Sequence, residues 1–273
     1  MGNKVKGWIK YFFIYILLIL FIVPFLLMVI NSFKTTQQFV SSPFSLPVKI
    51  DFGNYAAAFT RMNFLNGFAN SLIVTLISVA LIILTSSMAS YFLVRNKSKV
   101  SKAIFAMLVA SMIVPFQAVM IPLVSIYGNM KFLNNKWSLI FMYLGFGQAF
   151  AVFIFHGFIK NVPLEMEEAV LIDGGNKLQS FFRIVFPLLT PVTVTILILD
   201  ILWIWNDYLL PSLVLLSPLQ RTLPLSTYSF FQSYSVDYAP LMAGIILTIL
   251  PVLIAYVFCQ KQIVKGVVQG AIK

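Results

Sequence analysis

Half of the acidic residues of this chain lie in one short segment between two apolar stretches. The sequence has eight Asp and Glu residues in all, and four of them fall here: Glu165, Glu167, Glu168 and Asp173. Gly174 and Gly175 follow directly, so the charged run ends at a point where the backbone can turn sharply. A polar, structured segment of this kind is typical of a surface that touches a soluble partner. The segment is therefore a candidate contact surface for a soluble partner.

The sequence lacks the usual signatures of catalysis. It contains no G-x-x-x-x-G-K-[ST] loop for nucleotide phosphates, no H-E-x-x-H and no G-x-S-x-G. Its one histidine, His156, and its one cysteine, Cys259, both belong to apolar segments, where packing roles are expected. A single histidine and a single cysteine do not make a metal site. We therefore expect that this chain binds no metal or cofactor of its own.

A second group of polar residues interrupts the apolar stretch 190–214. Asp200 lies ten residues into it, about 15 Å along a helix. A carboxylate at that depth in a membrane costs at least about 2.5–3.5 kcal/mol, so it should face water or a polar partner. Trp203 and Asp207 follow at helical spacing, and an aromatic ring beside carboxylates can stack on a sugar and bond its hydroxyls. Together with Asn206 they are candidate residues of a translocation path, although Asp200 could equally hold two helices together by a hydrogen bond.

The elements that must position these residues are membrane helices. The chain is 60% hydrophobic and only 10% charged, whereas soluble domains carry about 25% charged residues. Backbone groups in hydrocarbon must bond within their own segment, and no period-two alternation suggests a barrel. We predict an all-α polytopic protein whose residues 1–273 form a single domain with six transmembrane helices. The predicted spans are 11–31, 67–94, 103–127, 138–159, 190–214 and 240–260.

The distribution of basic residues predicts the orientation. With the N-terminus inside, 13 of the 19 Lys and Arg residues fall in inner segments and six in outer ones. This excess indicates that both termini and the segment 160–189 are cytoplasmic. The net charge of +11 then reflects membrane orientation, and no nucleic-acid partner is expected.

The acidic segment itself predicts two short helices. Asn161 can cap the first, 164–172, with Pro163 in its first turn and Gly174 at its end. The second helix carries an apolar stripe and ends at Pro187, which interrupts it before the fifth membrane helix begins. The stripe consists of Leu178, Phe181, Phe182, Val185 and Phe186. The first helix is apolar on most sides and too short to span a bilayer, which favours burial against a partner protein. An elbow that rests on the lipid surface is the alternative.

The spacing of this segment resembles a known motif. It has Glu168-Ala169-Val170, three residues, Gly174, nine residues, Ile184, one residue, and Phe186-Pro187. This is similar to the EAA loop of ABC-importer permeases, from which only Val170 and Phe186 depart. The resemblance implies the type I importer permease fold, with the first short helix as a cytoplasmic coupling helix that docks in a cleft of an ATPase subunit. The coupling positions would be Glu168, Ala169, Asp173 and Gly174, with the glutamate paired to a basic ATPase residue.

Further matches resemble the carbohydrate branch of these importers. They are Asn54-Tyr55, Asn70-Ser71-Leu72, Trp205-Asn206-Asp207 and the tail 265–273, which is similar to the end of the maltose-type second permease subunit. In that family the tail reaches into the ATPase dimer, which implies a contact at Gln269 and Gly270. The implied partners are a second, different permease, two ATPase subunits that bind ATP and Mg, an extracellular solute-binding protein, membrane lipid and a carbohydrate substrate. The implied location is the bacterial cell membrane.

Three alternatives remain at this point. One is an ABC permease for a non-sugar solute. The second is a membrane-embedded enzyme, which the absence of clustered polar ligands disfavours. The third is a scaffold without a transport path, in which substitutions at Glu168 or Gly174 would leave uptake intact.

Overall fold

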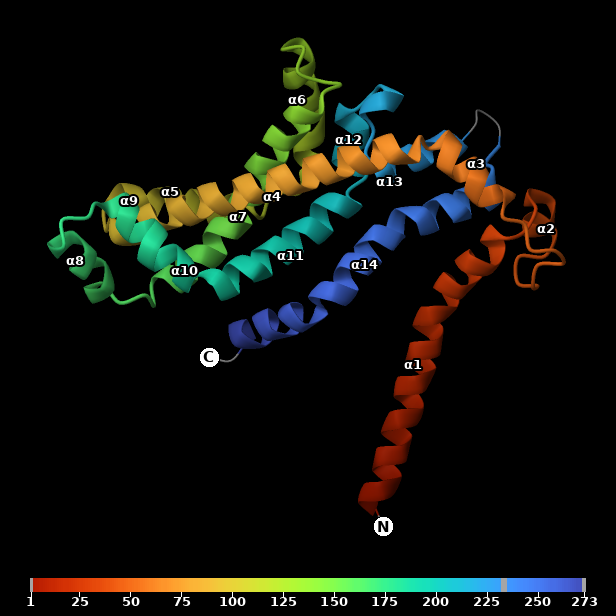
Figure 1. The fold of residues 1–273 in the computed structure, drawn as a ribbon, viewed down its shortest axis with the longest axis horizontal. Helices are drawn as coiled ribbons and strands as arrows, with labels where there is room; N and C mark the ends of the chain where they lie inside the picture. The colour runs from red at the N-terminus through yellow and green to blue at the C-terminus, as the bar shows by residue number, and fades with distance from the viewer. Residues whose placement is uncertain (1, 232–234, 272–273) are drawn as a thin grey trace. The chain divides into compact units, whose positions relative to one another are not determined.

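A computed structural model describes residues 2–231 and 235–271, and no β-strand is present among them. Figure 1 shows the helices in chain order. The α-helices are α1 (Gly2–Ser32), α2 (Thr36–Ser41), α3 (Gly53–Arg61), α4 (Phe64–Arg95), α5 (Lys99–Ser111), α6 (Phe116–Asn129), α7 (Lys136–Ile159), α8 (Glu165–Ile172), α9 (Lys177–Ser180), α10 (Phe186–Leu188), α11 (Thr190–Asn206), α12 (Leu209–Val214), α13 (Leu223–Ser226) and α14 (Tyr238–Ala271). A π-helical turn, η1 (Phe181–Val185), and two 3-10 turns, η2 (Pro218–Gln220) and η3 (Thr227–Phe230), complete them.

In the described residues, four helices are long and apolar enough to cross a membrane alone: Lys10–Ser32, Phe64–Arg95, Lys136–Ile159 and Tyr238–Val257. Two further pairs of helices pass the same test, each bent sharply at a short break. Six spans result when each bent pair counts as one. The prediction of an all-α, polytopic membrane protein is confirmed.

The predicted span 103–127 is not one continuous helix. The chain turns by 101° between α5 and α6, and Pro115 stands at the turn with an extended backbone, immediately before α6. Proline has no N–H to continue the helical hydrogen bonds, and it disfavours helical geometry in the residue before it. The apolar composition that predicted a single helix does not register this local break.

The predicted span 190–214 is likewise interrupted. Helix α11 ends at Asn206, and Asp207 adopts an extended conformation before α12 begins. The Asp207 carboxylate accepts a hydrogen bond from the Leu209 backbone N–H at 3.0 Å, which offers the chain a turn in place of another helical residue. At its other end α11 meets α10 at an angle of 75°. The break falls at Leu189, two residues after Pro187, because Pro187 and Pro191 each fit the first turn of a helix.

The chain contains two compact units. The first comprises Met1–Gly67 and Ser226–Pro251. Within it, Arg61 pairs with Asp237 at 2.6 Å, and the hydroxyl of Thr36 donates to the same carboxylate at 2.9 Å. A side chain at Gly244 would stand 2.8 Å from Met62 and Phe230, so glycine is required for this packing. These contacts tie the loop after α1 to the start of α14.

The second unit comprises Phe68–Leu225 and Val252–Lys273. Helices α4, α7 and α11 share its apolar core. A side chain at Gly147 of α7 would stand 2.5 Å from Ile82 of α4, which indicates that these helices approach closely there. The hydroxyl of Ser90 on α4 also donates to the Val152 carbonyl of α7 at 3.1 Å. Helices α8, α9 and α10 lie together at the end of α4 that Arg95 closes (Figure 1). The expectation of a single domain stays a prediction.

Candidate functional site

The short acidic helix predicted at 164–172 is present as α8, from Glu165 to Ile172. Its three glutamates occupy the first turn, where they complement the positive end of the helix dipole. The predicted cap is wrong. The Asn161 amide donates to the Gly157 carbonyl at 3.2 Å and therefore closes the end of α7 in place of opening α8. Leu164 precedes α8 and provides no side-chain cap.

Two glycines end α8 as the sequence predicts. Gly174 has φ = +83°, a conformation that only glycine adopts without strain. The Gly175 N–H donates to the Val170 carbonyl at 2.8 Å and the Gly174 N–H to the Leu171 carbonyl at 3.1 Å. This pair of bonds is the Schellman arrangement, which satisfies the last carbonyls of the helix. A side chain at Gly175 would lie 2.6 Å from the Val170 side chain, so both glycines are needed for the turn.

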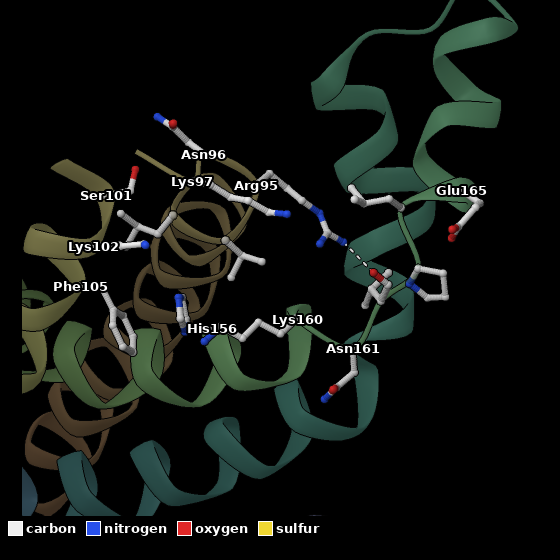
Figure 2. A pocket seen from close by; sticks show the side chains of 15 residues that line it. Arg95, Asn96, Lys97, Ser101, Lys102, Phe105, His156, Lys160, Asn161 and Glu165 are labelled. Atoms are coloured by element: carbon white, nitrogen blue, oxygen red, sulfur yellow. Dashed lines mark hydrogen bonds between the residues drawn. The ribbon is translucent and has the colours of Figure 1, made fainter. Parts of the chain in front are cut away.

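An ion pair fixes α8 to the end of α4. Arg95 donates to one Glu167 oxygen from Nε at 2.9 Å and from Nη2 at 2.5 Å. The Tyr91 hydroxyl donates to the other oxygen at 2.8 Å, and Arg95 also reaches the Val162 carbonyl at 2.9 Å, as the dashed line in Figure 2 shows. The Glu167 side chain is only 6% exposed. The carboxylate therefore holds α8 against a membrane helix, and it is not available to a partner.

The face of α8 away from this pair is open. Glu168, Ala169, Asp173 and Gly174 are all exposed. Exposed apolar side chains flank them, and Ile172 is the most prominent at 85% exposure. A solvent-exposed apolar side chain of that size at a helix end gains free energy if a partner covers it. The arrangement can therefore support docking against another protein through apolar contact and ion pairing.

The chain after α8 folds back into α9 and the π-turn η1, and both contact α8. Asn176 and Gln179 form a capping box that begins α9, and the chain then passes through the π-turn η1. Phe181 and Val185 of the predicted stripe are buried, whereas Leu178 and Phe182 are largely exposed. The extra residue of a π-turn rotates the helix face, so the stripe is not buried as a single surface.

The polar residues of α11 divide into two groups. The Asp207 carboxylate accepts from the Tyr143 hydroxyl of α7 at 2.8 Å, and the Trp203 ring meets the Tyr143 ring edge-on at 5.5 Å. These three side chains form one cluster. Asp200 is 3% exposed, and its Oδ2 has no hydrogen-bond partner among the described residues. Asn206 donates to its own helix at the Leu202 carbonyl and does not join the cluster.

Residues 81–268 match the family described as the binding-protein-dependent transport system inner membrane component. The chain belongs to this family. The permease is accordingly an integral membrane component of an ABC importer, a transport subunit and not an enzyme, which works with a solute-binding protein and an ATPase. The described residues contain no group of three or more His, Cys, Asp or Glu side chains that could hold a metal.

Several curated relatives match almost the whole permease. The probable starch degradation products transport system permease protein AmyC of Thermoanaerobacterium thermosulfurigenes is 43% identical over 258 residues, with 94% of each chain covered. The multiple sugar-binding transport system permease protein MsmG of Streptococcus mutans is 36% identical, over 97% of this chain and 98% of the relative. The melibiose/raffinose/stachyose import permease protein MelC of Bacillus subtilis is 34% identical, over 92% and 91%.

A solved structure shows the same fold. It is a crystal structure of a bacterial ABC transporter involved in the import of the acidic polysaccharide alginate, with a TM-score of 0.83 and 20% identity. The alignment covers 96% of the permease and 97% of the solved chain. The helix breaks and the position of α8 thus occur within a fold already known for an ABC importer.

Three residues that organise the two sites were not predicted from the sequence. Arg95 and Tyr91, which hold Glu167, lie more than seventy positions from it, so no spacing along the chain indicates the contact. Tyr143 lies in an apolar run and gives no signal apart from its hydroxyl. The predicted contact residues Gln269 and Gly270 lie in the last part of α14, but their side chains are outside the part of the chain that the structure describes.

Proposed function

We propose that this permease is one of two different membrane subunits of an ABC importer that carries a carbohydrate into a bacterial cell. The observation that carries the coupling role is the division of α8 into two faces. Glu167 is held by Arg95 and Tyr91, while Glu168 and Ile172 are exposed. A helix that is fixed to a membrane helix on one side and open on the other can transmit the movement of a docked subunit.

The carbohydrate substrate is supported by the relatives. Three of them, at 34–43% identity, are named for starch degradation products, multiple sugars and melibiose, raffinose and stachyose. The cluster of Tyr143, Trp203 and Asp207 offers the chemistry that a sugar needs, because an aromatic face packs on sugar C–H groups and a carboxylate accepts hydrogen bonds from hydroxyls. Trp203 is 41% exposed, so its ring is accessible.

In this proposal both termini and α8 are cytoplasmic, and two ATPase subunits bind ATP and Mg. One ATPase subunit docks on the exposed face of α8 through Glu168, Ala169, Asp173 and Gly174, and the tail at Gln269 and Gly270 provides a second contact. ATP-driven closure moves α8, and the Arg95–Glu167 pair passes the movement to α4. Coupling requires that the ATPase subunits bind ATP more tightly when the membrane helices are in one arrangement than when they are in the other.

The test is co-purification of the tagged permease with its partners from the native membrane. We expect a second permease, an ATPase and a solute-binding protein. Proline cannot adopt the positive φ of Gly174, so Gly174→Pro should remove the ATPase while the second permease remains. Leu46→Asp is the matched control, because Leu46 is 74% exposed in the predicted outer loop. A permease that keeps the ATPase in the Gly174→Pro variant would contradict the proposal, and a binding protein that binds no carbohydrate would contradict the substrate class.

A further inference from the structure

A hollow lies where three helices of the second unit end or begin. Its volume is about 690 Å³. It is bounded by the last turn of α4, the first two turns of α5, the end of α7 and the chain that leads to α8 (Figure 2). Its walls include Leu93, Phe105 and Val162, and three lysines stand around it: Lys97, Lys102 and Lys160. The hollow therefore combines apolar walls with a positively charged rim.

The three lysines carry uncompensated charge. None of their ammonium groups forms an ion pair or hydrogen bond with another described residue, whereas the Arg95 guanidinium is already occupied by Glu167 and the Val162 carbonyl. The one carboxylate on the lining is Glu165, and its side chain points away from the lysines in Figure 2. The three ammonium groups therefore outnumber the one carboxylate of the lining, and the hollow attracts an anion.

Two aromatic rings line the hollow side by side. The His156 ring stacks on the Phe105 ring with their centroids 3.7 Å apart, and this contact joins α7 to α5. His156 lies four residues before Lys160, and residues at that spacing are neighbours on one helix face. The lining thus combines an aromatic pair with the ammonium group of Lys160.

The hollow lies at the level where the spans end. The apolar span of α4 ends at Arg95 and that of α7 at Ile159, one residue before Lys160. This is the depth of lipid headgroups, where Lys and Arg attract the anionic lipids of the cytoplasmic leaflet. A soluble anion would use the lysines but not the apolar walls, whereas a phospholipid uses both.

We propose that this hollow binds the phosphate headgroup of an anionic phospholipid, with Lys97, Lys102 and Lys160 as its counter-ions and the apolar walls against the glycerol and first methylenes. The proposal rests on the cytoplasmic placement of this face in the proposed function. Leu164 and Glu165 also line the hollow, so a bound lipid braces the chain from which α8 begins. The bilayer would thereby help to position the docking helix.

The test uses the tagged full-length permease with the subunits that co-purify with it, in detergent, offered phosphatidylglycerol or phosphatidylcholine in native mass spectrometry. Each lysine near an anionic headgroup contributes about a fivefold gain in affinity. We expect the wild type to prefer phosphatidylglycerol at least about tenfold and the Lys97→Gln/Lys102→Gln/Lys160→Gln variant to lose this preference. The matched control replaces three exposed lysines outside the hollow by glutamine, Lys49, Lys99 and Lys131, and should retain it.

Other outcomes overturn the proposal. A wild type without preference, or a triple variant that keeps it, contradicts a lipid site. Displacement of phosphatidylglycerol by millimolar glycerol phosphate indicates a site for soluble phosphate esters instead. ATPase co-purification from the same preparations separates the two proposals. If the ATPase is retained but the lipid preference does not depend on the three lysines, the lipid site is contradicted and the proposed function is not. If the preference depends on the lysines but no ATPase co-purifies, the proposed function is contradicted and the lipid site is not.

Discussion

Arg95 and Glu167 form an ion pair of two hydrogen bonds to one carboxylate oxygen, at 2.9 and 2.5 Å. Arg95 is the last residue of α4, and Glu167 lies in the first turn of α8. The arginine side chain is 18% exposed and the glutamate 6%, so water screens the pair only partly. Tyr91 holds the second oxygen. Three groups on two helices thus fix the orientation of α8.

Replacement of Glu167 by glutamine should loosen α8. The amide keeps the shape of the side chain but removes the charge, and hydrogen bonds to charged groups contribute about 1.5–3 kcal/mol each when they are buried. We expect Glu167→Gln to lower the midpoint of thermal unfolding of the purified importer and to reduce substrate-stimulated ATP hydrolysis. Tyr91→Phe should cost less, because it removes a single neutral donor.

Glu165→Gln is the matched control for this prediction. Glu165 lies in the same turn of α8 but is exposed. If both glutamine variants lose coupling to the same extent, then general loss of negative charge from α8 explains the effect, and the ion pair with Arg95 does not.

Gly174 should tolerate asparagine better than alanine. Its φ of +83° is costly for a residue with Cβ, and Gly→Ala at such a position destabilises by about 1 kcal/mol or more. Asparagine enters this region more readily. We expect ATPase co-purification to decrease in the order wild type, Gly174→Asn, Gly174→Ala.

Gly157→Ala provides the control for the glycine series. Gly157 has an ordinary helical backbone within α7, and a side chain there would meet nothing within 4 Å. Equal loss of the ATPase in the Gly157 and Gly174 alanine variants would show that the positive φ is not the cause.

Much of the fold follows from composition and local chemistry. The apolar runs place the long helices because only a helix satisfies its backbone in hydrocarbon. Gly174 marks the end of α8 for a reason that is local to that residue. Pro115 explains the break between α5 and α6 once the structure is known. It could not predict the break, because proline also occurs inside continuous helices, as Pro122 and Pro251 do here.

The organisation of the candidate sites could not be predicted in the same way. Glu167 is one of three neighbouring glutamates, and the sequence does not indicate which one faces the membrane helices. Its burial depends on Arg95 and Tyr91, which approach only after α4 and α8 pack. The role of Tyr143 depends similarly on the break at Asp207, which the apolar composition of 190–214 conceals.

Lys34 gives a prediction about pH. Its side chain is fully buried, with Nζ donating to the Ser42 carbonyl at 2.9 Å and the Pro43 carbonyl at 3.1 Å. Burial lowers the pKa of Lys34 from its ordinary 10.5 because desolvation disfavours the charged form. Between the lowered pKa and 10.5 the unfolded loop binds more protons than the folded loop, so folding of the loop becomes more favourable as pH rises through that window.

The loop after α1 should therefore resist proteolysis better at the upper end of that pH window than at its lower end. Lys34→Met removes the titration and both hydrogen bonds, so it should make the loop more sensitive at every pH and abolish the pH dependence. Lys49→Met is the control, because Lys49 is exposed in the same loop. A pH dependence that survives Lys34→Met would assign it to another group.

Tyr143→Phe should impair transport without releasing the ATPase. The substitution removes the hydroxyl that donates to Asp207 at 2.8 Å and leaves the Trp203 contact in place. A lost hydrogen bond to a carboxylate costs about 1.5–3 kcal/mol, which corresponds to a reduction in uptake of roughly tenfold or more if Asp207 must hold its orientation during transport.

Uptake of labelled sugar in proteoliposomes, at several concentrations, measures the effect. Tyr127→Phe on α6 is the control, because the Tyr127 ring packs against Phe132 and takes no part in the hydrogen bond to Asp207. Uptake that is unchanged in Tyr143→Phe, with the same ATPase content as wild type, would remove the cluster from the translocation path.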